Sequence, residues 1–550
     1  MQPPEPQSPT EALDLQNKIA DTLAGKRPFD NRYPYFPPDY DVPFLHIGTE
    51  RQLFLDNFIL DHLENVERHF PKPERSAGPL VQGSELPWEK SASIFTAAAL
   101  HDPEERKFKL WYCTSLGNDP FGDQGMIMCC AESTDCIHWE KPRYPDCIPH
   151  QDHSATNIVL EDSGHHITLA RNHDQSDPAR KYLLAHNPGG KAQAAGQGPL
   201  STFSVSPDGR VWTTINEHTP YRHHHFQRPI WDASIQQWIS YSQYSHHWNF
   251  LHQKRQIGRQ TSDNFINWSP KEVVLSGDWD PNLPPHVEYH DLSVRKIGGL
   301  YIGILTEFAA EPQWCVREGH NWRDTAYAGL SLHASRDGKR WQRVGNAAEY
   351  WVPTGPPGTY DYGFVNNTVA GQLVHEGKTY IMYGARGEKQ SWYGRPEQVS
   401  ADLMPESVFA RGQRERQALV DTLDTYPRYG QTIGALILRE DGWAQLKPTY
   451  EQGAVITRQF VFEGNTLRLN AEAYGGYLRV ELLDPHFKPY PGFSTDQCQP
   501  ITAANPDQIW HTVSWKDNAD LRTLWNKPVR LVIHLHQASL YAFQFSQSPD

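Results

Sequence analysis

Carboxylates and imidazoles gather in short polar segments, each of which precedes an apolar run of strand-like composition. If one fold brought these segments together, one group could donate a proton while an ionised group attacked or activated water, as acid/base chemistry on a polar substrate requires. The segments are Trp88-Glu89-Lys90, His150-Gln-Asp152-His153, His223-His-His225 with Arg228, His286-Val-Glu288-Tyr-His290-Asp291 and Tyr360-Asp361.

Each candidate also has a structural interpretation. Glu288 alternates with Val287 and Tyr289, as a solvent-facing strand residue would. Asp361 follows the turn-rich segment Pro356-Pro-Gly-Thr-Tyr360 and could be a turn residue. Glu388 opens a long insertion just after Arg386 and is a further candidate. Both interpretations stay open at this point.

The 27 histidines raise the question of a metal site. The run His223–His225 has no spacing that directs three rings at one ion, and His286 and His290 would stand about 13 Å apart along a strand. We therefore predict no cofactor and assign His153, His225 and His290 to hydrogen bonding with substrate. A single structural metal ion in a central channel is the alternative.

A repeated sequence motif, which we call the repeated phrase, indicates which elements position these groups. Five copies end apolar runs with a polar turn and a tryptophan, and repeats of one supersecondary unit are typical of propellers and solenoids. An Asp-Gly pair suits the tight turn of a hairpin, so we expect the Asp of each copy to be a turn residue. The copies are 133–139, 206–212, 261–268, 335–341 and a degenerate 439–443, with Asp135, Asp208, Asp263, Asp337 and Asp441.

Two further strands precede each phrase, which predicts five four-stranded antiparallel blades. In a blade, the start of the innermost strand and the loop between the second and third strands share one face of the propeller. The phrases then lie on the opposite face, away from the candidate site. The predicted strand pairs are 93–101 with 108–113, 166–171 with 181–186, 226–232 with 237–244, 287–297 with 300–308, and 363–372 with 379–384.

The strand pattern and the presence or absence of the repeated phrase divide the chain into three parts. Residues 1–43 form an N-terminal extension and 44–447 the five-bladed β-propeller. From 448 to 550, strands alternate without the repeated phrase, which is the pattern of a β-sandwich. The predicted fold class is therefore all-β, a five-bladed β-propeller followed by a β-sandwich domain.

Composition limits the partners. The formal charge of −14 argues against nucleic acid and anionic membranes, and no apolar run is long enough to span a membrane. Seven cysteines without ligand-like spacing are expected to be reduced and mostly buried. No signal peptide is visible, which predicts a cytoplasmic protein, or a secreted or periplasmic one if a leader was removed. The oligomeric state is left open.

Four motifs point to a known family: Arg51-Gln-Leu-Phe-Leu-Asp56, Phe108-Lys-Leu-Trp-Tyr112, Ser335-Arg-Asp-Gly-Lys-Arg-Trp341 and Gly355-Pro-Pro-Gly-Thr-Tyr-Asp361. They resemble motifs of glycosidase-like five-bladed propeller proteins and, more distantly, of propeller hydrolases of the arabinanase and β-fructosidase type. The resemblance covers roughly 48–445, and the C-terminal part is similar to the β-sandwich appended to the same proteins. It implies acidic residues near the channel axis and an oligosaccharide or polysaccharide substrate.

The resulting hypothesis is a glycoside hydrolase that cleaves a terminal or short oligosaccharide linkage in the propeller funnel. Glu288 is the expected general acid, with Asp361 or Asp152 as base or nucleophile. The alternatives are a glycoside phosphorylase, with arginines beside the funnel for phosphate, and a non-catalytic carbohydrate-binding propeller. Substrate binding is assigned to Glu89, His153, His225, Arg228, Trp248, His290, Arg386 and Glu388, with Trp248 stacking on a sugar ring or anchoring its own loop.

Overall fold

The computed structural model is built almost entirely of strands. Among the residues that the structure describes, the helical segments are three 3₁₀ turns, at Pro178–Arg180, Gly277–Trp279 and Arg522–Leu524. No described helix is long and apolar enough to cross a membrane. The described residues are 44–90, 93–116, 125–164, 167–186, 201–219, 229–244, 255–281, 283, 287–309, 327–346, 349–387, 431–502, 508–516 and 520–547.

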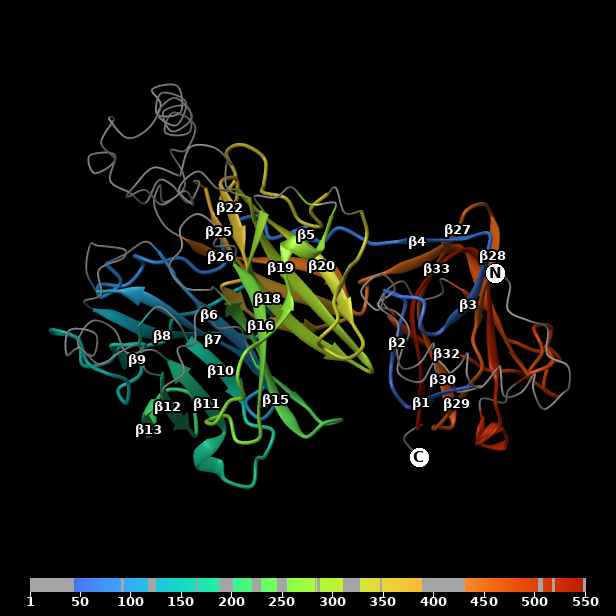
Figure 1. Ribbon diagram of the computed structural model, residues 1–550, viewed down its shortest axis with the longest axis horizontal. Helices are drawn as coiled ribbons and strands as arrows, with labels where there is room; N and C mark the ends of the chain where they lie inside the picture. The colour runs from blue at the N-terminus through green and yellow to red at the C-terminus, as the bar shows by residue number, and fades with distance from the viewer. Residues whose placement is uncertain are drawn as a thin grey trace, which may run out of the picture. The chain divides into compact units, whose positions relative to one another are not determined.

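Five antiparallel sheets follow one another along the chain and confirm the predicted five-bladed propeller (Figure 1). Blade 1 contains β6 (Ala97–Asp102), β7 (Lys107–Ser115), β8 (Met126–Ser133) and β9 (Ile158–Glu161); blade 2 contains β10 (Ile167–Arg171), β11 (Tyr182–His186), β12 (Ser201–Ser206) and β13 (Thr213–Thr219); blade 3 contains β14 (Ile230–Asp232), β15 (Gln237–Tyr244), β16 (Gln256–Ser262) and β17 (Glu272–Leu275); blade 4 contains β18 (Val287–Ile297), β19 (Leu300–Ala309), β20 (Tyr327–Ser335) and β21 (Gln342–Arg343).

Blade 5 is assembled from distant parts of the chain. It contains β22 (Phe364–Asn366), β24 (Gln372–His375), β25 (Lys378–Arg386) and β26 (Thr432–Arg439), and its outermost strand is β5 (Glu74–Arg75), which precedes blade 1. The short strand β23 (Val369–Ala370) pairs in parallel with β6 of blade 1. The prediction that the fifth phrase forms the outer hairpin of blade 5 is therefore wrong, because an N-terminal strand already occupies that edge.

The blades are held together by apolar clusters between neighbouring sheets. Apolar side chains of blades 5 and 1 share one cluster, those of blades 1 and 2 the next, and those of blades 3 and 4 another. Aromatic and β-branched residues supply most of this surface, since they suit a pleated sheet that is buried on both faces. The six cysteines that the structure describes are free and buried.

The repeated phrases form compact turns whose geometry explains their composition. In the fourth copy, Asp337 Oδ1 accepts from the backbone N–H groups of Lys339 and Arg340, each at 2.8 Å, and Ser335 Oγ accepts from Gly338 N–H at 3.0 Å. Gly338 has φ +68°, a conformation that favours glycine. In the third copy, Asn264 rather than the predicted Asp263 caps the turn, so that copy begins one residue later than expected.

The C-terminal residues form a separate β domain, as predicted. Its strands are β27 (Gln445–Pro448), β28 (Gln452–Thr457), β29 (Phe460–Phe462), β30 (Thr466–Leu483), β31 (Ile501–Thr502), β32 (Trp510–Thr512) and β33 (Arg530–Ser546). The two longest strands, β30 and β33, pair along nearly their whole length.

The expected propeller boundaries need correction. β1 (Leu45–Gly48), β2 (Gln52–Leu53), β3 (Leu60–Glu64) and β4 (Val66–His69) were assigned to the propeller but pair with strands of the C-terminal domain (Figure 1). β27 begins before the predicted boundary and joins the same sheet. Sequence texture cannot indicate such pairing, because it depends on which sheet edge the strand meets.

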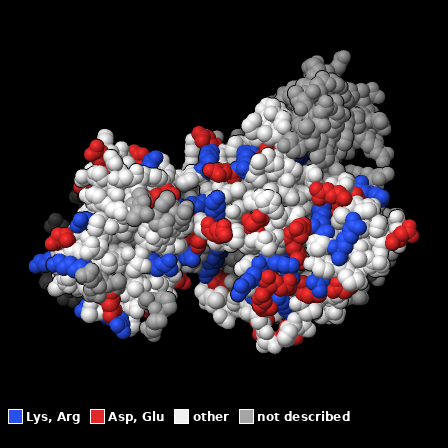
Figure 2. Space-filling model, turned by 180° about the vertical axis from the view of Figure 1, so that it is seen from behind, with Lys and Arg blue, Asp and Glu red and all other residues white. Residues whose placement is uncertain are grey.

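Charge is dispersed on the face that Figure 2 shows, where basic and acidic side chains alternate over the surface. Charged side chains of the described residues are often paired, for example Arg171 with Glu104 at 2.9 Å and Lys107 with Glu132 at 2.6 Å. The negative formal charge of the chain is therefore not gathered into one acidic patch on this face.

Candidate active site

A β-bulge interrupts the innermost strand of blade 4. Tyr289 faces Glu307 and Leu292 faces Leu305, so His290 and Asp291 together oppose the single residue Thr306. A bulge re-aims the side chains beside it and is common next to active sites. Val287 and Tyr289 before the bulge, and Leu292 and Val294 after it, all pack into the cluster between blades 3 and 4.

Glu288 and His290 consequently lie on the other side of the strand. Glu288 is fully buried, accepts the backbone N–H of Arg255 at 3.1 Å and forms an ion pair with the Arg255 guanidinium at 3.3 Å. His290 Nδ1 bonds the carboxylate of Asp291, and its ring stacks on Phe308 with centroids 5.8 Å apart. A buried carboxylate and an imidazole–carboxylate pair therefore stand two residues apart.

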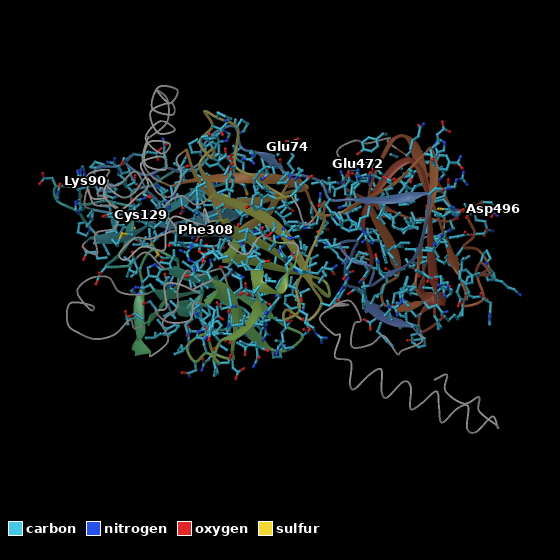
Figure 3. The ribbon with its side chains drawn as sticks, turned by 45° about the horizontal axis from the view of Figure 1, so that its top comes forward. Glu74, Lys90, Cys129, Phe308, Glu472 and Asp496 are labelled. Atoms are coloured by element: carbon cyan, nitrogen blue, oxygen red, sulfur yellow. The ribbon has the colours of Figure 1, made fainter. Side chains whose placement is uncertain are left out.

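Two phenylalanines join blade 4 to blade 5 beside these groups. Phe308 of β19 meets Phe364 of β22 edge to face, with centroids 5.8 Å apart (Figure 3 labels Phe308). Arg255 lies over the Phe308 ring at 4.9 Å, and Arg386 lies over the Phe364 ring at 5.3 Å. Of the predicted site residues, Glu288, His290 and Arg386 are thus brought together, each linked to the others through this aromatic pair.

An amide network holds Arg386 in place. Gln431, the residue before β26, accepts from Asn366 at 2.8 Å and from Arg386 at 3.3 Å. Its amide donates to Thr368 Oγ1 at 2.7 Å, and its backbone N–H donates to Ser93 Oγ of blade 1 at 3.1 Å. The starts of the innermost strands of blades 5 and 1 are therefore tied together beside the cluster.

Glu89 and His153 form a second group, in blade 1. Four donors converge on Glu89: the backbone N–H groups of residues 85 and 86, Tyr112 Oη at 2.5 Å and Lys141 Nζ at 2.9 Å. The ring of His153 meets Trp88 edge to face, and Trp88 donates to Asn157 Oδ1 at 2.8 Å. None of these contacts joins Glu89 or His153 to Glu288.

Asp361 and Asp152 lie in different surroundings again. Asp361 is buried, accepts from Thr359 at 2.7 Å and Tyr383 at 3.0 Å, and forms an ion pair with Arg75 of the outermost strand of blade 5. Asp152 is exposed and lies in the connection between β8 and β9, before the outer strand of blade 1. The sequence interpretation placed it at the start of blade 2 because β9 was not predicted.

The remaining predicted residues, His225, Arg228, Trp248 and Glu388, lie outside the described residues, as does the N-terminal extension 1–43. The prediction of substrate-binding residues did not include Phe308, Phe364 or Gln431. The strand pattern could have indicated the two phenylalanines, since Phe308 lies at the end of one predicted strand and Phe364 near the start of another, both on the side of the candidate site. Gln431 gave none, because its role depends on the end of a long insertion.

Metal binding finds no support in the described part of the chain, where no group of three or more His, Cys, Asp or Glu side chains is placed to hold an ion. The predicted absence of a cofactor, and the alternative of a structural channel ion, both stay predictions.

Comparison with known proteins finds likeness in solved structures. No protein-family model matches the sequence, and no curated protein matches it. The chain is similar to an N-acetylgalactosamine deacetylase from F. plautii in complex with blood group B trisaccharide, with 13% identity, 70% of this chain and 96% of that chain covered, and a TM-score of 0.38.

It is also similar to a thermostable family-43 glycoside hydrolase (9% identity, 57% and 87% covered, TM-score 0.35) and to the α-L-arabinanase of Penicillium chrysogenum complexed with arabinobiose (12% identity, 56% and 80% covered, TM-score 0.30). At such low identity and TM-score, function has to be argued from the side chains of the site.

Proposed function

We propose that this chain is a glycan-acting enzyme whose active site is the cluster of Glu288, His290, Asp291, Arg255 and Arg386 at the start of the innermost strands. The observation that carries the proposal is the burial of Glu288 on an innermost strand, two residues before a buried imidazole–carboxylate pair at a β-bulge. Titratable groups in unlike surroundings, close together, are the usual arrangement for acid/base work.

The contacts revise the expected roles. An ion pair is a contact of the charged carboxylate, so Glu288 suits the part of base, nucleophile or stabiliser of positive charge rather than that of general acid. His290, held by Asp291, is then the proton donor to the leaving oxygen. Asp361 and Asp152, the expected partners of Glu288, have structural or exposed positions and do not enter this assignment.

Arginines and amides beside the carboxylate suit a substrate with many oxygen atoms. Arg255 and Arg386 each stack on a phenylalanine, and they also contact Glu288 and Gln431, so both planar guanidinium groups are held in a defined orientation beside the carboxylate. Asn366 and Gln431 add amide groups of the kind that recognise hydroxyls. Together with the sequence resemblance to propeller glycosidases, these groups support an oligosaccharide substrate and hydrolysis of a glycosidic bond.

A phosphorylase is the second candidate, favoured by the same two arginines. The experiment that separates the candidates incubates the protein with a panel of neutral and acidic oligosaccharides, with and without inorganic phosphate. Release of free reducing sugar in both conditions supports the hydrolase. A sugar 1-phosphate formed only with phosphate supports the phosphorylase, and binding without any product supports a carbohydrate-binding propeller.

A further inference from the structure

A cavity lies toward the other end of the innermost strands from Glu288. Its volume is about 430 Å³, within the range of about 300–1,000 Å³ typical of small-molecule sites. Lys296, near the end of β18, lines it, whereas Glu288 is the second residue of the same strand. The lining residues of β18 are Ser293 to Lys296, which at about 3.3 Å per residue lie about 16–26 Å along the strand from Glu288. Glu288, His290 and Asp291 are not among the described residues that line the cavity, so we treat it as a separate site. We call it the exit-side pocket.

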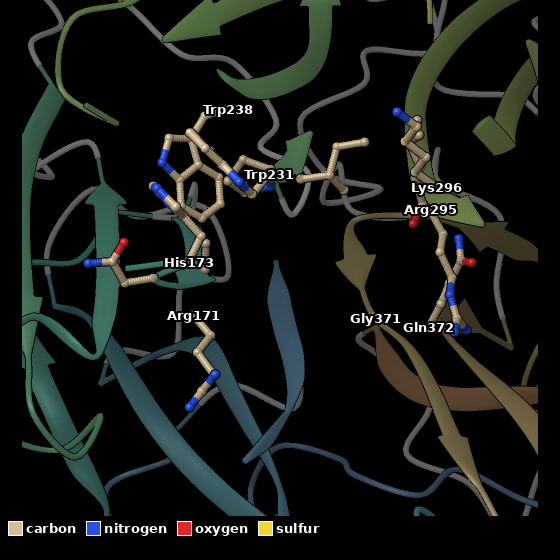
Figure 4. Close-up of a pocket in the computed structure, with 14 residues that line it drawn as sticks. Arg171, His173, Trp231, Trp238, Arg295, Lys296, Gly371 and Gln372 are labelled. Carbon is tan, nitrogen blue, oxygen red and sulfur yellow. The ribbon is translucent and has the colours of Figure 1, made fainter. Parts of the chain in front are cut away.

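One wall of the exit-side pocket is aromatic (Figure 4). The ring of His173 stacks on Trp231, with centroids 3.4 Å apart and planes within 4°. Trp231 meets Trp238 edge to face at 5.6 Å. His173 is exposed while Trp238 is buried, so the stack runs from the surface into the cavity. Such a platform suits the apolar face of a ring-shaped ligand.

The facing wall is polar and cationic. Arg295, Lys296 and Gln372 line it, in the same view (Figure 4), and Arg171 lines the cavity below His173. No acidic side chain is among the described residues that line the cavity. Arg171 and Lys296 are paired with Glu104 and Asp232, at 2.9 Å and 2.6 Å. Arg295 and Gln372, among the described residues of this wall, have buried polar atoms without a hydrogen-bond partner.

Gln372 points to a ligand most directly. It is 8% exposed, and among the residues that the structure describes neither its amide nitrogen nor its amide oxygen has a hydrogen-bond partner. The same holds for Nη1 of Arg295, a buried atom. Burial also lowers the pKa of Arg295, against the opposing effect of Asp441. A buried amide without partners is destabilising, and a ligand that bonded it would remove that cost.

We propose that the exit-side pocket binds an acidic oligosaccharide, in which a sugar ring stacks on His173 and Trp231, adjacent hydroxyls bond the Gln372 amide, and a uronic-acid carboxylate pairs with Arg295. A neutral sugar would leave the arginine unpaired, and an aliphatic acid would not use the aromatic wall. This binding site would let the protein hold an acidic glycan chain away from the proposed catalytic groups, and it does not depend on what reaction they perform.

Titration calorimetry and quenching of tryptophan fluorescence test the proposal, with α-1,4-digalacturonate as the probe and galactobiose as its neutral counterpart. The full-length protein carries Glu288→Gln throughout, so that turnover does not consume the probe. We expect the acid to bind at least tenfold more tightly than the neutral sugar. His173→Ala and Gln372→Met should each weaken binding of the acid at least tenfold, and His62→Ala, an exposed control, should not.

Thermal unfolding without ligand separates binding from folding. Because the Gln372 amide has no partner, Gln372→Met should leave the melting temperature unchanged or raise it; a clear fall would assign the amide a structural role and overturn its part in the site. The proposal is also overturned if both probes bind equally, if neither binds at millimolar concentration, or if the two variants bind as the parent does. If the wild-type protein turns over no glycan, the proposed function is contradicted, but the binding proposal is not.

Discussion

At the scale of single residues, the most informative contrast is between two buried carboxylates. Glu288 accepts a hydrogen bond from the Arg255 backbone, pairs with the Arg255 guanidinium and lies on the same side of its strand as His290. Asp361 is bound by Thr359, Tyr383 and Arg75, which belong to a turn and two strands of blade 5. Glu288 is therefore the candidate for a catalytic role, whereas Asp361 connects parts of one blade.

Asp361→Asn should therefore lower stability and spare activity. Loss of the charge-assisted hydrogen bonds costs about 1–3 kcal/mol, reduced because Arg75 is partly exposed. Urea denaturation should show this loss, while the turnover number, measured where the variant is folded, should stay within about twofold of the wild type. A hundredfold loss of turnover with unchanged stability would return Asp361 to the catalytic role that the sequence suggested.

At the scale of elements, the turn formed by the repeated phrase of one blade contacts the preceding blade. Tyr241 of blade 3 donates to the carbonyl of Gly338 in the phrase of blade 4 at 2.7 Å, and Trp111 of blade 1 donates to that of Gly209 in blade 2 at 2.6 Å. A Cβ at position 338 would stand 2.6 Å from Tyr241 Oη, where the backbone also has positive φ.

Gly338→Ala should accordingly cost about 1–3 kcal/mol, through both the strained conformation and the contact with Tyr241. Lys339→Ala, at the neighbouring exposed position, is the matched control and should change stability by less than about 0.5 kcal/mol. Denaturant midpoints measure both. Equal stability of the two variants would show that the phrase does not hold the blades together.

The strand pattern and its limits also belong to this scale. The bounds of β15 and β18 were predicted to the residue, because aromatic and β-branched runs between polar turns define them well. The bulge at His290 and Asp291 was not predicted, because an alternating pattern gives no sign of one extra residue until the partner strand is known. Asp152 was misplaced for a related reason, as the short β9 has no distinctive pattern.

At the scale of the whole molecule, ring closure and blade contacts depend on residues far apart in the chain. Asp102 of blade 1 binds Lys181 at 2.7 Å and Tyr182 at 2.6 Å, both of blade 2. Burial raises the pKa of Asp102, but the hydrogen bonds from Lys181 and Tyr182 outweigh burial and hold the pKa well below its ordinary value of 3.8. The contact is thus between charged groups at neutral pH.

Asp102→Asn should destabilise the protein by about 1.5–3 kcal/mol at pH 7. A carboxyl with a lowered folded-state pKa contributes stability that is present above its unfolded pKa and is lost as the pH falls toward the folded value. The difference in unfolding free energy between wild type and variant should therefore shrink below about pH 4. A difference that stays constant from pH 7 to pH 3 would contradict the ion-pair account.

The pairing of β5 with β26 makes an N-terminal strand part of blade 5, so the propeller depends on residues that precede blade 1. Deletion of residues 1–76 removes the outer strand of blade 5 and β1–β4 of the C-terminal sheet, so we expect insoluble or unfolded protein. Deletion of 1–43 leaves every pairing described here and should yield folded protein by circular dichroism and denaturation. A folded, cooperative product from the longer deletion would show that neither sheet needs these strands.

The central claim is that Glu288 performs chemistry on a glycan, and Glu288→Gln tests it most directly. The measurement is the initial rate of product release from the best oligosaccharide of the panel, for wild type and variant, with substrate affinity and the unfolding midpoint measured alongside. We predict a rate at least a thousandfold lower, with affinity within about tenfold and the fold intact, as loss of an essential catalytic group gives. A variant that turns over substrate at the wild-type rate would contradict the account.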